Sequence, residues 1–332
     1  MTLPVQKLAR NLPEWVRRGA PSSGLDWLVR LALGVPMGLA VVALSGIGHR
    51  GFDILAQFTA PALIITAGLT ALLALTRLKA AALHGLAAAI ALALAVAPQW
   101  APAGPRVEAT APMVRLYSAN LYYLNDDVPA IRRSIEAANA DVVVLIEVGQ
   151  GPARRIDEVL EGFPYRAASM RMDLTRGQSQ SIIGSRFPLT VLPDPPDGLH
   201  AVAAVAQTPL GRLNVVGVHL TRPWPFREQW GQISQAMALK AVVGTMTGPV
   251  LVAGDFNSVS SARIGKQIRH DLDVHAAPGF PGTWPTDLPA PLTMTIDQVY
   301  ASRDLAFVTR RLGLANGSDH RPVVTEITRA AD

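Results

Sequence analysis

Three long apolar segments before residue 100 constrain the fold of this chain more than any other feature of its sequence. They cover about residues 31–48, 54–75 and 80–97, and each has about the 17 to 25 residues that a helix needs to cross a bilayer. A cleaved signal peptide has one short apolar region, and these segments are apolar all round, unlike the helices of a soluble core. The pattern predicts three transmembrane helices, with a helical core domain as the alternative.

The basic residues near these segments predict their orientation, because Lys and Arg close to a membrane span remain in the cytoplasm. The residues before the first segment include Lys7, Arg10, Arg17, Arg18 and Arg30. Arg77 and Lys79 lie between the second and third segments, whereas the first loop has Arg50 close to Asp53. We therefore expect residues 1–30 to be a basic cytoplasmic N-terminus of a multi-pass protein of the bacterial inner or cell membrane. Everything after the third segment is then periplasmic or extracellular.

The charge of the chain is concentrated in this apolar part. Of the 30 basic and 25 acidic residues, eight and three precede residue 102, so this part carries 8 − 3 = +5, and the remainder carries 22 of each. A nuclease that grips a duplex needs a basic face, so a neutral domain disfavours that function without excluding it. The absence of Cys is compatible with an oxidising compartment.

Beyond the membrane region of residues 31–97, the Pro-, Ala- and Gly-rich segment 98–112 predicts a linker. Residues 113–329 then alternate between strand-like and helical patterns and form a predicted catalytic domain. The predicted strands cover residues 114–119, 142–147, 180–185, 201–207, 213–219, 250–253, 295–301 and 323–327. The predicted helices cover residues 128–138, 152–160, 227–246 and 262–268.

Several predicted strands end in side chains that suit metal and phosphate chemistry. Asp255 and Asn257 follow an apolar run, and at positions i and i+2 of an extended segment they point to the same face. Glu147 ends another apolar run, where a buried carboxylate requires a cation or hydrogen-bond donors. The alternatives are a turn at residues 254–258 and a salt bridge at Glu147.

Six short motifs in this order resemble the endonuclease/exonuclease/phosphatase superfamily over about residues 112–329. They are Asn120, Ile146-Glu147, His219, Gly254-Asp255-Phe256-Asn257, Ile296-Asp297 and Ser318-Asp319-His320. Each motif alone is weak evidence, but their order makes the resemblance specific. The resemblance implies an α+β fold, a four-layer αββα sandwich of the DNase I-like type, with the activity of a divalent-metal phosphoesterase.

The resemblance also implies roles for these residues. Glu147 is expected to be the principal ligand of Mg²⁺ or Mn²⁺, with Asn120 and Asp319 completing or supporting the ligand shell. Asp255 is expected to orient or deprotonate the attacking water, and Asn257 to hold that water or a phosphate oxygen.

Two histidines are expected to stabilise the negative charge that develops on the phosphoryl oxygens, namely His219 and His320. Asp297 is expected to accept a hydrogen bond from His320, which fixes the tautomer of the imidazole and favours its charged form. The sequence leaves open whether Asp255 or His320 is the general base.

Three further residues are candidates for substrate binding. Arg186 is available to contact a phosphate, and Trp224 and Phe226 follow His219 in a loop whose aromatic tip suits a membrane interface. The alternative for these two aromatics is a hydrophobic staple of the following helix.

We therefore expect a membrane-anchored hydrolase that cleaves a phosphate ester or anhydride, on a lipid or lipid-linked substrate, at the outer face of the membrane. The alternatives are an extracytoplasmic nuclease and a binding module that recognises a phosphorylated ligand without turnover. The sequence leaves open the choice among monoester, diester and pyrophosphate, the number of metal ions and the oligomeric state.

Overall fold

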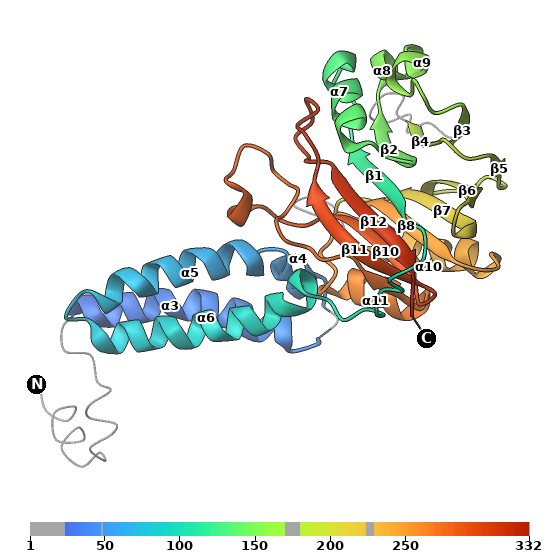
Figure 1. The fold of residues 1–332 in the computed structure, drawn as a ribbon. Helices are drawn as coiled ribbons and strands as arrows, with labels where there is room; N and C mark the ends of the chain where they lie inside the picture. The colour runs from blue at the N-terminus through green and yellow to red at the C-terminus, as the bar shows by residue number, and fades with distance from the viewer. Residues whose placement is uncertain (1–23, 48, 170–179, 224–228, 332) are drawn as a thin grey trace, which may run out of the picture.

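A sandwich of two mixed β-sheets forms most of the molecule, and a bundle of helices projects from it (Figure 1). The computed structural model describes residues 24–47, 49–169, 180–223 and 229–331. The first sheet has the strand order β11-β12-β1-β2-β4-β3, and the second has the order β5-β6-β7-β8-β10-β9. The first sheet consists of β1 (Val114–Asn120), β2 (Val142–Val148), β3 (Tyr165–Ala168), β4 (Gln180–Ser185), β11 (Leu305–Leu312) and β12 (Val323–Arg329). The second consists of β5 (Leu189–Val191), β6 (His200–Thr208), β7 (Gly211–His219), β8 (Val250–Asp255), β9 (Val274–Ala276) and β10 (Asp297–Ser302).

Each sheet has one central parallel pair, and the other strand pairs are antiparallel. β1 runs parallel to β2 in the first sheet, and β7 runs parallel to β8 in the second. β2, β7 and β8 are rich in Val, Leu and Ile, and all four strands are mostly buried, as expected of parallel strands that are covered on both faces. The carboxyl ends of each parallel pair lie at one edge of its sheet, which is where their polar residues gather.

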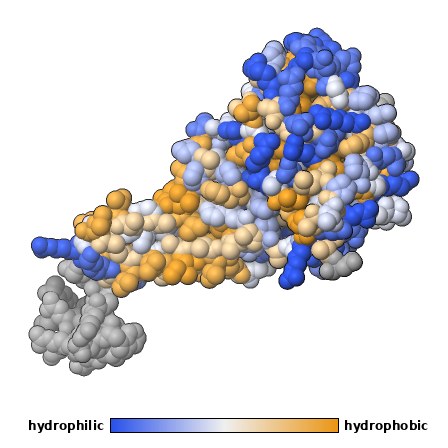
Figure 2. All heavy atoms as spheres, in the orientation of Figure 1, coloured by the Kyte–Doolittle hydropathy of each residue, from blue (hydrophilic) through white to orange (hydrophobic). Residues whose placement is uncertain are grey.

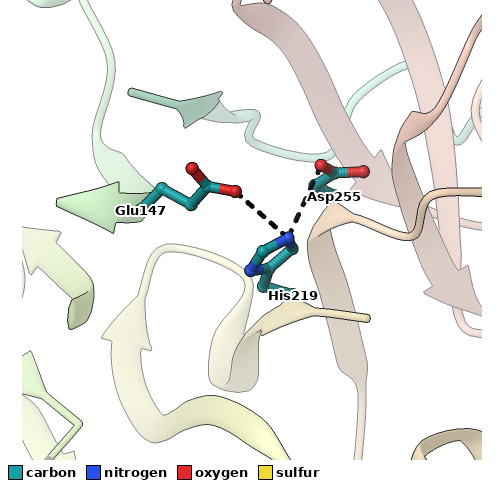
Figure 3. A group of neighbouring side chains, drawn as sticks. All are labelled: Glu147, His219 and Asp255. Atoms are coloured by element: carbon teal, nitrogen blue, oxygen red, sulfur yellow. Dashed lines mark ion pairs between the residues drawn. The ribbon is translucent and has the colours of Figure 1, made fainter. Parts of the chain in front are cut away.

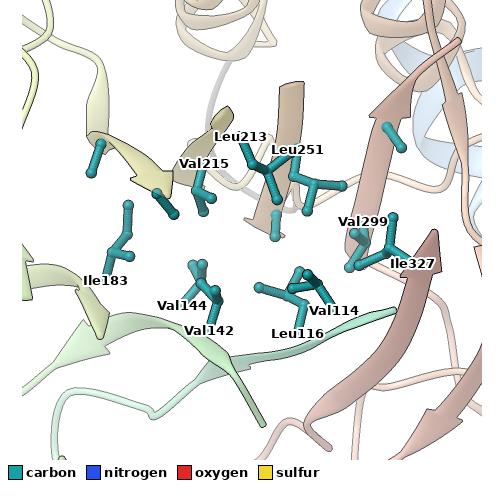
Figure 4. Packing of buried hydrophobic residues seen from close by; sticks show 14 of the residues in the cluster. Val114, Leu116, Val142, Val144, Ile183, Leu213, Val215, Leu251, Val299 and Ile327 are labelled. Carbon is teal, nitrogen blue, oxygen red and sulfur yellow. The ribbon is translucent and has the colours of Figure 1, made fainter. Parts of the chain in front are cut away.

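The main hydrophobic core fills the space between the two sheets (Figure 4). Val142 and Val144 of the first sheet face Leu213 and Val215 of the second in this cluster. Successive side chains of a strand point to opposite faces, so the alternate residues of β2 face outward instead. The apolar runs read from the sequence thus supply both faces of each sheet.

Helices cover the outer face of each sheet. The first sheet is covered by α7 (Val128–Ala138), α8 (Gln150–Arg154) and α9 (Ile156–Val159), and the second by α10 (Trp230–Gly244) and α11 (Arg263–Asp271). A short 3₁₀ helix, η1 (Ala290–Leu292), precedes β10. The α+β sandwich that the resemblance implied is confirmed.

The helical region contains α3 (Gly24–Leu44), α4 (Arg50–Ala56), α5 (Thr59–Ala74) and α6 (Lys79–Trp100). Within the described residues, two helices, α3 and α6, are long and apolar enough to cross a membrane. The prediction of three such helices is wrong in this respect, because the second apolar segment is divided into α4 and the 16-residue α5.

The break between α4 and α5 lies just before Pro61. Proline has no backbone N–H and clashes with the preceding turn in a helix interior, but it is accepted in the first turn of a helix. The chain leaves the first helix at Gln57 and starts the second at Thr59, so that Pro61 falls in the first turn of α5. The turn between the two helices faces the sandwich (Figure 1).

The outer surface of the bundle is apolar (Figure 2). In the most apolar stretch of each helix, only 11% of α3 and 39% of α6 is buried. Neither helix is therefore enclosed like the core helix of a soluble domain. α6 packs against both α3 and α5, and their solvent-facing side chains include Val35, Ile65 and Leu94.

The predicted linker, residues 98–112, packs against the sandwich. α6 continues through Pro98 to Trp100, whose ring lies 4.8 Å from that of Phe280. Farther along, the amide of Ala331 donates a hydrogen bond of 2.8 Å to the carbonyl oxygen of Arg106. The linker is therefore held against the sandwich near its start and near its middle.

Candidate active site

Polar residues from five strands meet at one edge of the sandwich. Asn120 ends β1, and Glu147 lies near the end of β2 in the first sheet. His219 ends β7 and pairs directly with Asp255, the last residue of β8, while Asp297 at the start of β10 pairs with Asp255 from the other side. The strand register therefore places His219, Asp255 and Asp297 next to one another.

Glu147 extends from the first sheet toward the second. Its φ of +53° lies in the left-handed region, and the pairing of β2 with β4 is irregular around it. Such irregularities redirect side chains near functional sites. The Oε1 atom of Glu147 lies 3.3 Å from Nε2 of His219, and Figure 3 shows Glu147 and Asp255 on either side of the His219 ring.

Asp255 is the central carboxylate of the cluster and is fully buried. Its Oδ2 accepts a hydrogen bond of 3.1 Å from Nδ2 of Asn120, which links the two sheets. The same oxygen lies 3.8 Å from Nε2 of His219 and 3.9 Å from Nε2 of His320. Burial raises the pKa of Asp255 to about 6, against the opposing effect of the positive charge of His320.

Gly254 allows β8 to approach β7 closely at this edge. Its φ is +142°, and a Cβ atom at this position would lie 2.0 Å from the carbonyl oxygen of Val218. Only glycine adopts this conformation readily and leaves this space free. The Gly-Asp pair is thus a structural requirement for placing Asp255 beside His219.

Asn257 is fixed by hydrogen bonds at its amide and its side chain. Its backbone N–H donates to Oδ1 of Asp255 at 2.8 Å, and its Nδ2 donates to the carbonyl oxygen of Leu220 at 2.9 Å. The same Nδ2 lies 3.3 Å from Oδ2 of Asp255 and 3.5 Å from Nε2 of His219. The carboxamide is therefore directed to the centre of the cluster, although its φ of +46° is left-handed.

His320 and Asp297 form a buried ion pair. Nδ1 of His320 donates to Oδ2 of Asp297 at 2.8 Å, which leaves Nε2 facing Asp255. Burial by itself lowers the pKa of His320, but the charge of Asp297 and the hydrogen bond to it, together with the charges of Asp255 and Asp319, raise it to about 10. The pairing with Asp297 therefore favours the cationic form of the imidazole.

Asp319 lies at the outer side of the site and is exposed. Its Oδ2 accepts a hydrogen bond of 3.0 Å from the indole Nε1 of Trp284. The guanidinium of Arg222 lies 5.1 Å from the centre of the Trp284 ring. This arrangement adds a cation to the cavity in which the acidic residues lie.

These residues surround one cavity of about 330 Å³. Its polar lining consists of Glu147, His219, Arg222, Asp255, Asn257, Asp319 and His320. Its largely apolar lining consists of Phe58, Tyr122, Tyr123, Pro223, Trp284, Pro285, Leu288, Met294 and Ile296, and Gln57 also contributes. The cavity is therefore suited to a ligand with an anionic part and an apolar part.

The donor set of the site fits a divalent cation. Ligand atoms of Glu147, His219 and Asp255 lie within 4.8 Å of one another, and so do those of Asp255, Asp297 and His320. Hard carboxylate oxygens suit Mg²⁺, and a nearby imidazole is also compatible with Mn²⁺. Glu147 in the first group is the better candidate ligand, because His320 in the second group is already paired with Asp297.

The structure brings together eight of the eleven residues predicted from the sequence, and the remaining three are Arg186, Trp224 and Phe226. Arg186 follows β4 at the opposite end of β2 from Glu147, where its Nη1 lies 4.0 Å from Oδ1 of Asp141. This places Arg186 away from the cavity, because β4 runs antiparallel to β2. Trp224 and Phe226 lie outside the described residues.

Several residues of the cavity wall were not predicted. Trp284 and Met294 come from the segment before β10, and Gln57 and Phe58 come from the turn between α4 and α5. The adjacent Trp284 and Pro285 are the local signal in the sequence for this segment. No local pattern connects Gln57 with residues about 200 positions later in the chain.

Comparison with known proteins agrees with this fold. A model of the endonuclease/exonuclease/phosphatase family matches residues 117–320, whereas no curated protein matches the chain. Among solved structures, an endonuclease/exonuclease/phosphatase from Beutenbergia cavernae DSM 12333 is 20% identical, with a TM-score of 0.52 over 66% of this chain and 72% of that one.

Two other solved structures share the fold at lower identity. An endonuclease/exonuclease/phosphatase from Bacteroides vulgatus is 17% identical, with a TM-score of 0.51 over 66% of this chain and 99% of that one. TDP2 from D. rerio, humanized by 14 mutations, is 13% identical, with a TM-score of 0.53 over 65% of this chain and 99% of that one. The family match covers the strands that carry the cluster, from β1 to His320, and the chain therefore belongs to the endonuclease/exonuclease/phosphatase family.

Proposed function

We propose that this protein is a membrane-anchored, divalent-metal-dependent hydrolase of a phosphate ester or anhydride. The observation that carries the proposal is the convergence of Glu147, Asp255 and His320 from two sheets on one cavity. Members of its family are hydrolases of phosphoester bonds. A module that only binds a phosphorylated ligand has no need for a buried, water-activating carboxylate.

The chemical roles follow from the charges of the cluster. Glu147, with Asn120 and Asp319 in support, would hold Mg²⁺ or Mn²⁺, which when bound supplies positive charge to the phosphoryl oxygens. Asp255 is the better base, because a carboxylate with a pKa near 6 accepts a proton close to neutral pH. The charge of Asp297 raises the pKa of His320 and favours its cationic form, so His320 instead donates a hydrogen bond.

In the proposed reaction, Asp255 takes a proton from water while the water oxygen forms a bond to phosphorus. The bond between phosphorus and the leaving oxygen breaks, and that oxygen leaves with the electron pair. Asn257 holds the water or a phosphoryl oxygen through its carboxamide, which lies next to both Asp255 and His219. His219 and His320 stabilise the charge on the phosphoryl oxygens.

The helical region supports membrane anchoring with the catalytic domain, residues 113–329, on the side opposite the N-terminus. The turn between α5 and α6 and the start of α3 lie at the end of the bundle away from the sandwich (Figure 1). If α3 and α6 cross the membrane, α5 must return the chain between them, although it is shorter. The basic residues of the N-terminus favour the cytoplasm for that end, which puts the cavity at the outer face.

The cavity supports a lipid or lipid-linked phosphoester as the substrate class. Phe58 directly precedes α5, and the segment around η1, which provides Leu288 and Met294, contacts α5. The apolar wall of the cavity thus adjoins the helices that we place in the membrane. A substrate anchored in the bilayer would present its phosphate to the polar wall and its apolar part to this one.

An assay of the full-length protein in detergent micelles tests the proposed activity. The substrates are bis(4-nitrophenyl) phosphate, 4-nitrophenyl phosphate and pyrophosphate, each with Mg²⁺ or Mn²⁺. We expect hydrolysis of at least one of them, with little inhibition by added DNA. Strong inhibition by DNA that weakens with salt would favour the alternative of a nuclease, and failure of the folded protein to hydrolyse any of the three would contradict the proposal.

The substrate class has a separate test in the exposed cavity residue Leu288. In the variant Leu288→Ser, kcat/KM for a long-chain lipid phosphate in vesicles should fall more than kcat/KM for bis(4-nitrophenyl) phosphate. Equal losses on the two substrates would contradict a lipid-binding role of this wall.

A further inference from the structure

The turn between α4 and α5 is part of the cavity wall, although it belongs to the helical region. Gln57 ends α4 and Phe58 precedes α5, and both line the cavity with Asp255 and Asn257. The helical region therefore does more than hold the sandwich close to a membrane, because its residues reach the reacting groups.

Gln57 is hydrogen-bonded to the backbone of a residue of the cluster. Its Nε2 donates to the carbonyl oxygen of Asn257 at 2.9 Å. Nε2 of Gln232 donates to the same oxygen at 3.2 Å and to the carbonyl oxygen of Phe256 at 2.8 Å. The Asn257 carbonyl thus has two amide donors, and the shorter hydrogen bond comes from the helical region.

The support matters because Asn257 has a left-handed backbone conformation. Its φ is +46°, in the left-handed region, where a non-glycine residue persists only with support from its surroundings. The structure supplies this support by fixing the carbonyl, the amide and the side chain of the residue. Loss of one of these contacts allows the peptide to rotate, and the carboxamide then moves away from Asp255 and His219.

Buried contacts between α4 and the sandwich hold Gln57 in place relative to Asn257. Asp53 of α4 is buried, and its carboxylate accepts hydrogen bonds from the backbone N–H of Arg263 and from Nε2 of Gln229. α11 begins at Arg263, and the residue before it makes no side-chain capping hydrogen bond. Asp53 of the helical region therefore caps the N-terminus of α11.

An apolar contact adds to these buried contacts. Ala56, directly before Gln57, packs in one cluster with Val259 and Ala262. Ala262 is the residue before α11, and Val259 follows the segment that contains Asn257. The contacts of Asp53 and Ala56 with the sandwich thus lie close to the hydrogen bond between Gln57 and Asn257.

We propose that Gln57 is a positioning residue of the active site, which acts through the carbonyl of Asn257. The helical region thereby contributes to the orientation of a catalytic side chain. The proposal rests on the proposed function. It predicts that disrupting this hydrogen bond slows the chemical step while substrate binding is retained, because Gln57 acts on the orientation of Asn257.

The test compares variants of the full-length protein in detergent micelles, with bis(4-nitrophenyl) phosphate as the probe. Gln57→Met keeps the length of the side chain and removes the donor, and Gln207→Met makes the same change at an exposed position of β6. We expect kcat of Gln57→Met to fall by about tenfold to a hundredfold, as for small misplacements of reacting groups, with KM within about twofold and the wild-type melting temperature nearly retained. Gln207→Met should behave as the wild type.

The variant Gln57→Glu distinguishes a positioning role of Gln57 from a purely structural one, because only a positioning role makes its relative kcat depend on pH. The introduced carboxyl donates a hydrogen bond only when it is protonated, so the ratio of its kcat to the wild-type kcat should rise as the pH falls. A pH-independent ratio, or a wild-type kcat in Gln57→Met, would overturn the proposal. An inactive wild-type protein would instead contradict the proposed phosphoesterase activity itself.

Discussion

At the scale of single residues, Asp255 is the side chain on which the proposed chemistry depends most. It is buried and contacts Asn120, while His219 and His320 face it. We predict that Asp255→Asn lowers kcat by about 10²- to 10⁴-fold, the usual contribution of a general base. Because burial opposes the charge of Asp255, the variant should be at least as stable as the wild type near pH 7, measured by chemical unfolding.

The matched control is Asp273→Asn, which removes an exposed carboxylate paired with Arg303 at 3.2 Å. This variant should retain the wild-type kcat. If Asp255→Asn also retained it, Asp255 would have no role as the base.

The pair of His320 and Asp297 gives the site a predictable dependence on pH. The pKa of His320 is about 10 in the folded protein, against 6.5 for the unperturbed group, despite the opposing effect of burial. The ion pair that raises the pKa of His320 stabilises the fold fully below about pH 6.5. This contribution to stability is lost as the pH rises through about 10. Activity that requires the cationic imidazole should therefore persist to alkaline pH.

Asp297→Asn removes the charge that raises the pKa of His320. We predict that the alkaline limb of kcat moves to lower pH by about 1 to 3 units, as expected for the loss of an adjacent opposite charge. The difference in unfolding free energy between the metal-free wild type and the variant should shrink as the pH rises from 6 to 10. An unchanged alkaline limb would show that another group is responsible for it.

Individual site residues were predictable where a local pattern carried the information. Glu147 and Asp255 each end an apolar run, and a polar residue at that place indicates the edge of a sheet. Gln57 and Trp284 were missed because their roles depend on tertiary contacts with Asn257 and Asp319. A hydrogen bond between residues 200 positions apart leaves no periodic signal.

At the scale of elements, the pairing of β7 and β8 depends on Gly254. Any other residue here would bring its Cβ within 2.0 Å of the Val218 carbonyl oxygen, at a φ of +142°. We predict that Gly254→Ala lowers the unfolding free energy by about 1 to 3 kcal/mol and reduces kcat, because Asp255 shifts with its strand. Gly244→Ala is the control, since a Cβ there meets no atom within 4 Å.

Chemical denaturation and the hydrolysis assay measure both effects in the same samples. A Gly254→Ala variant with the stability and kcat of Gly244→Ala would show that β8 accommodates a side chain at this position.

The long, buried elements were predicted well, and the short or peripheral ones were not. The predicted helix 128–138 and strand 180–185 coincide with α7 and β4, because amphipathic and β-branched patterns are strong there. β3, β5 and β9 have only three or four residues each, and β11 is partly exposed and polar. Such edge strands form through pairing with their neighbours rather than through their own pattern.

At the scale of the whole molecule, the order of motifs predicted the fold, whereas apolar length alone overestimated the spanning helices. The division of the second apolar segment at Gln57 coincides with a hydrogen bond from Gln57 to the sandwich and with Pro61 in the next turn. Apolar composition does not indicate either feature, so the sequence did not predict the contact between the helical region and the sandwich.

The topology of the protein gives a prediction at this scale. A periplasm-active reporter fused after Asp332 should be active in bacterial cells, and a cytoplasm-active reporter there should be silent, because the start of α3 lies at the end of the bundle away from the sandwich (Figure 1). The same reporters fused before Met1 serve as the control and should give the opposite result. The reverse pattern would place the cavity in the cytoplasm and favour soluble nucleotides or nucleic acids as substrates.

The central claim is that the cluster between the two sheets is a metal site that hydrolyses phosphoester bonds. The most direct measurement is hydrolysis of bis(4-nitrophenyl) phosphate by the full-length protein, with Mn²⁺ binding followed by electron paramagnetic resonance in the same samples. We predict that chelation removes activity, that Mg²⁺ or Mn²⁺ restores it, and that Glu147→Gln weakens both Mn²⁺ binding and hydrolysis. Hydrolysis that persists after chelation, or Mn²⁺ binding that is unaffected by Glu147→Gln, would contradict the account.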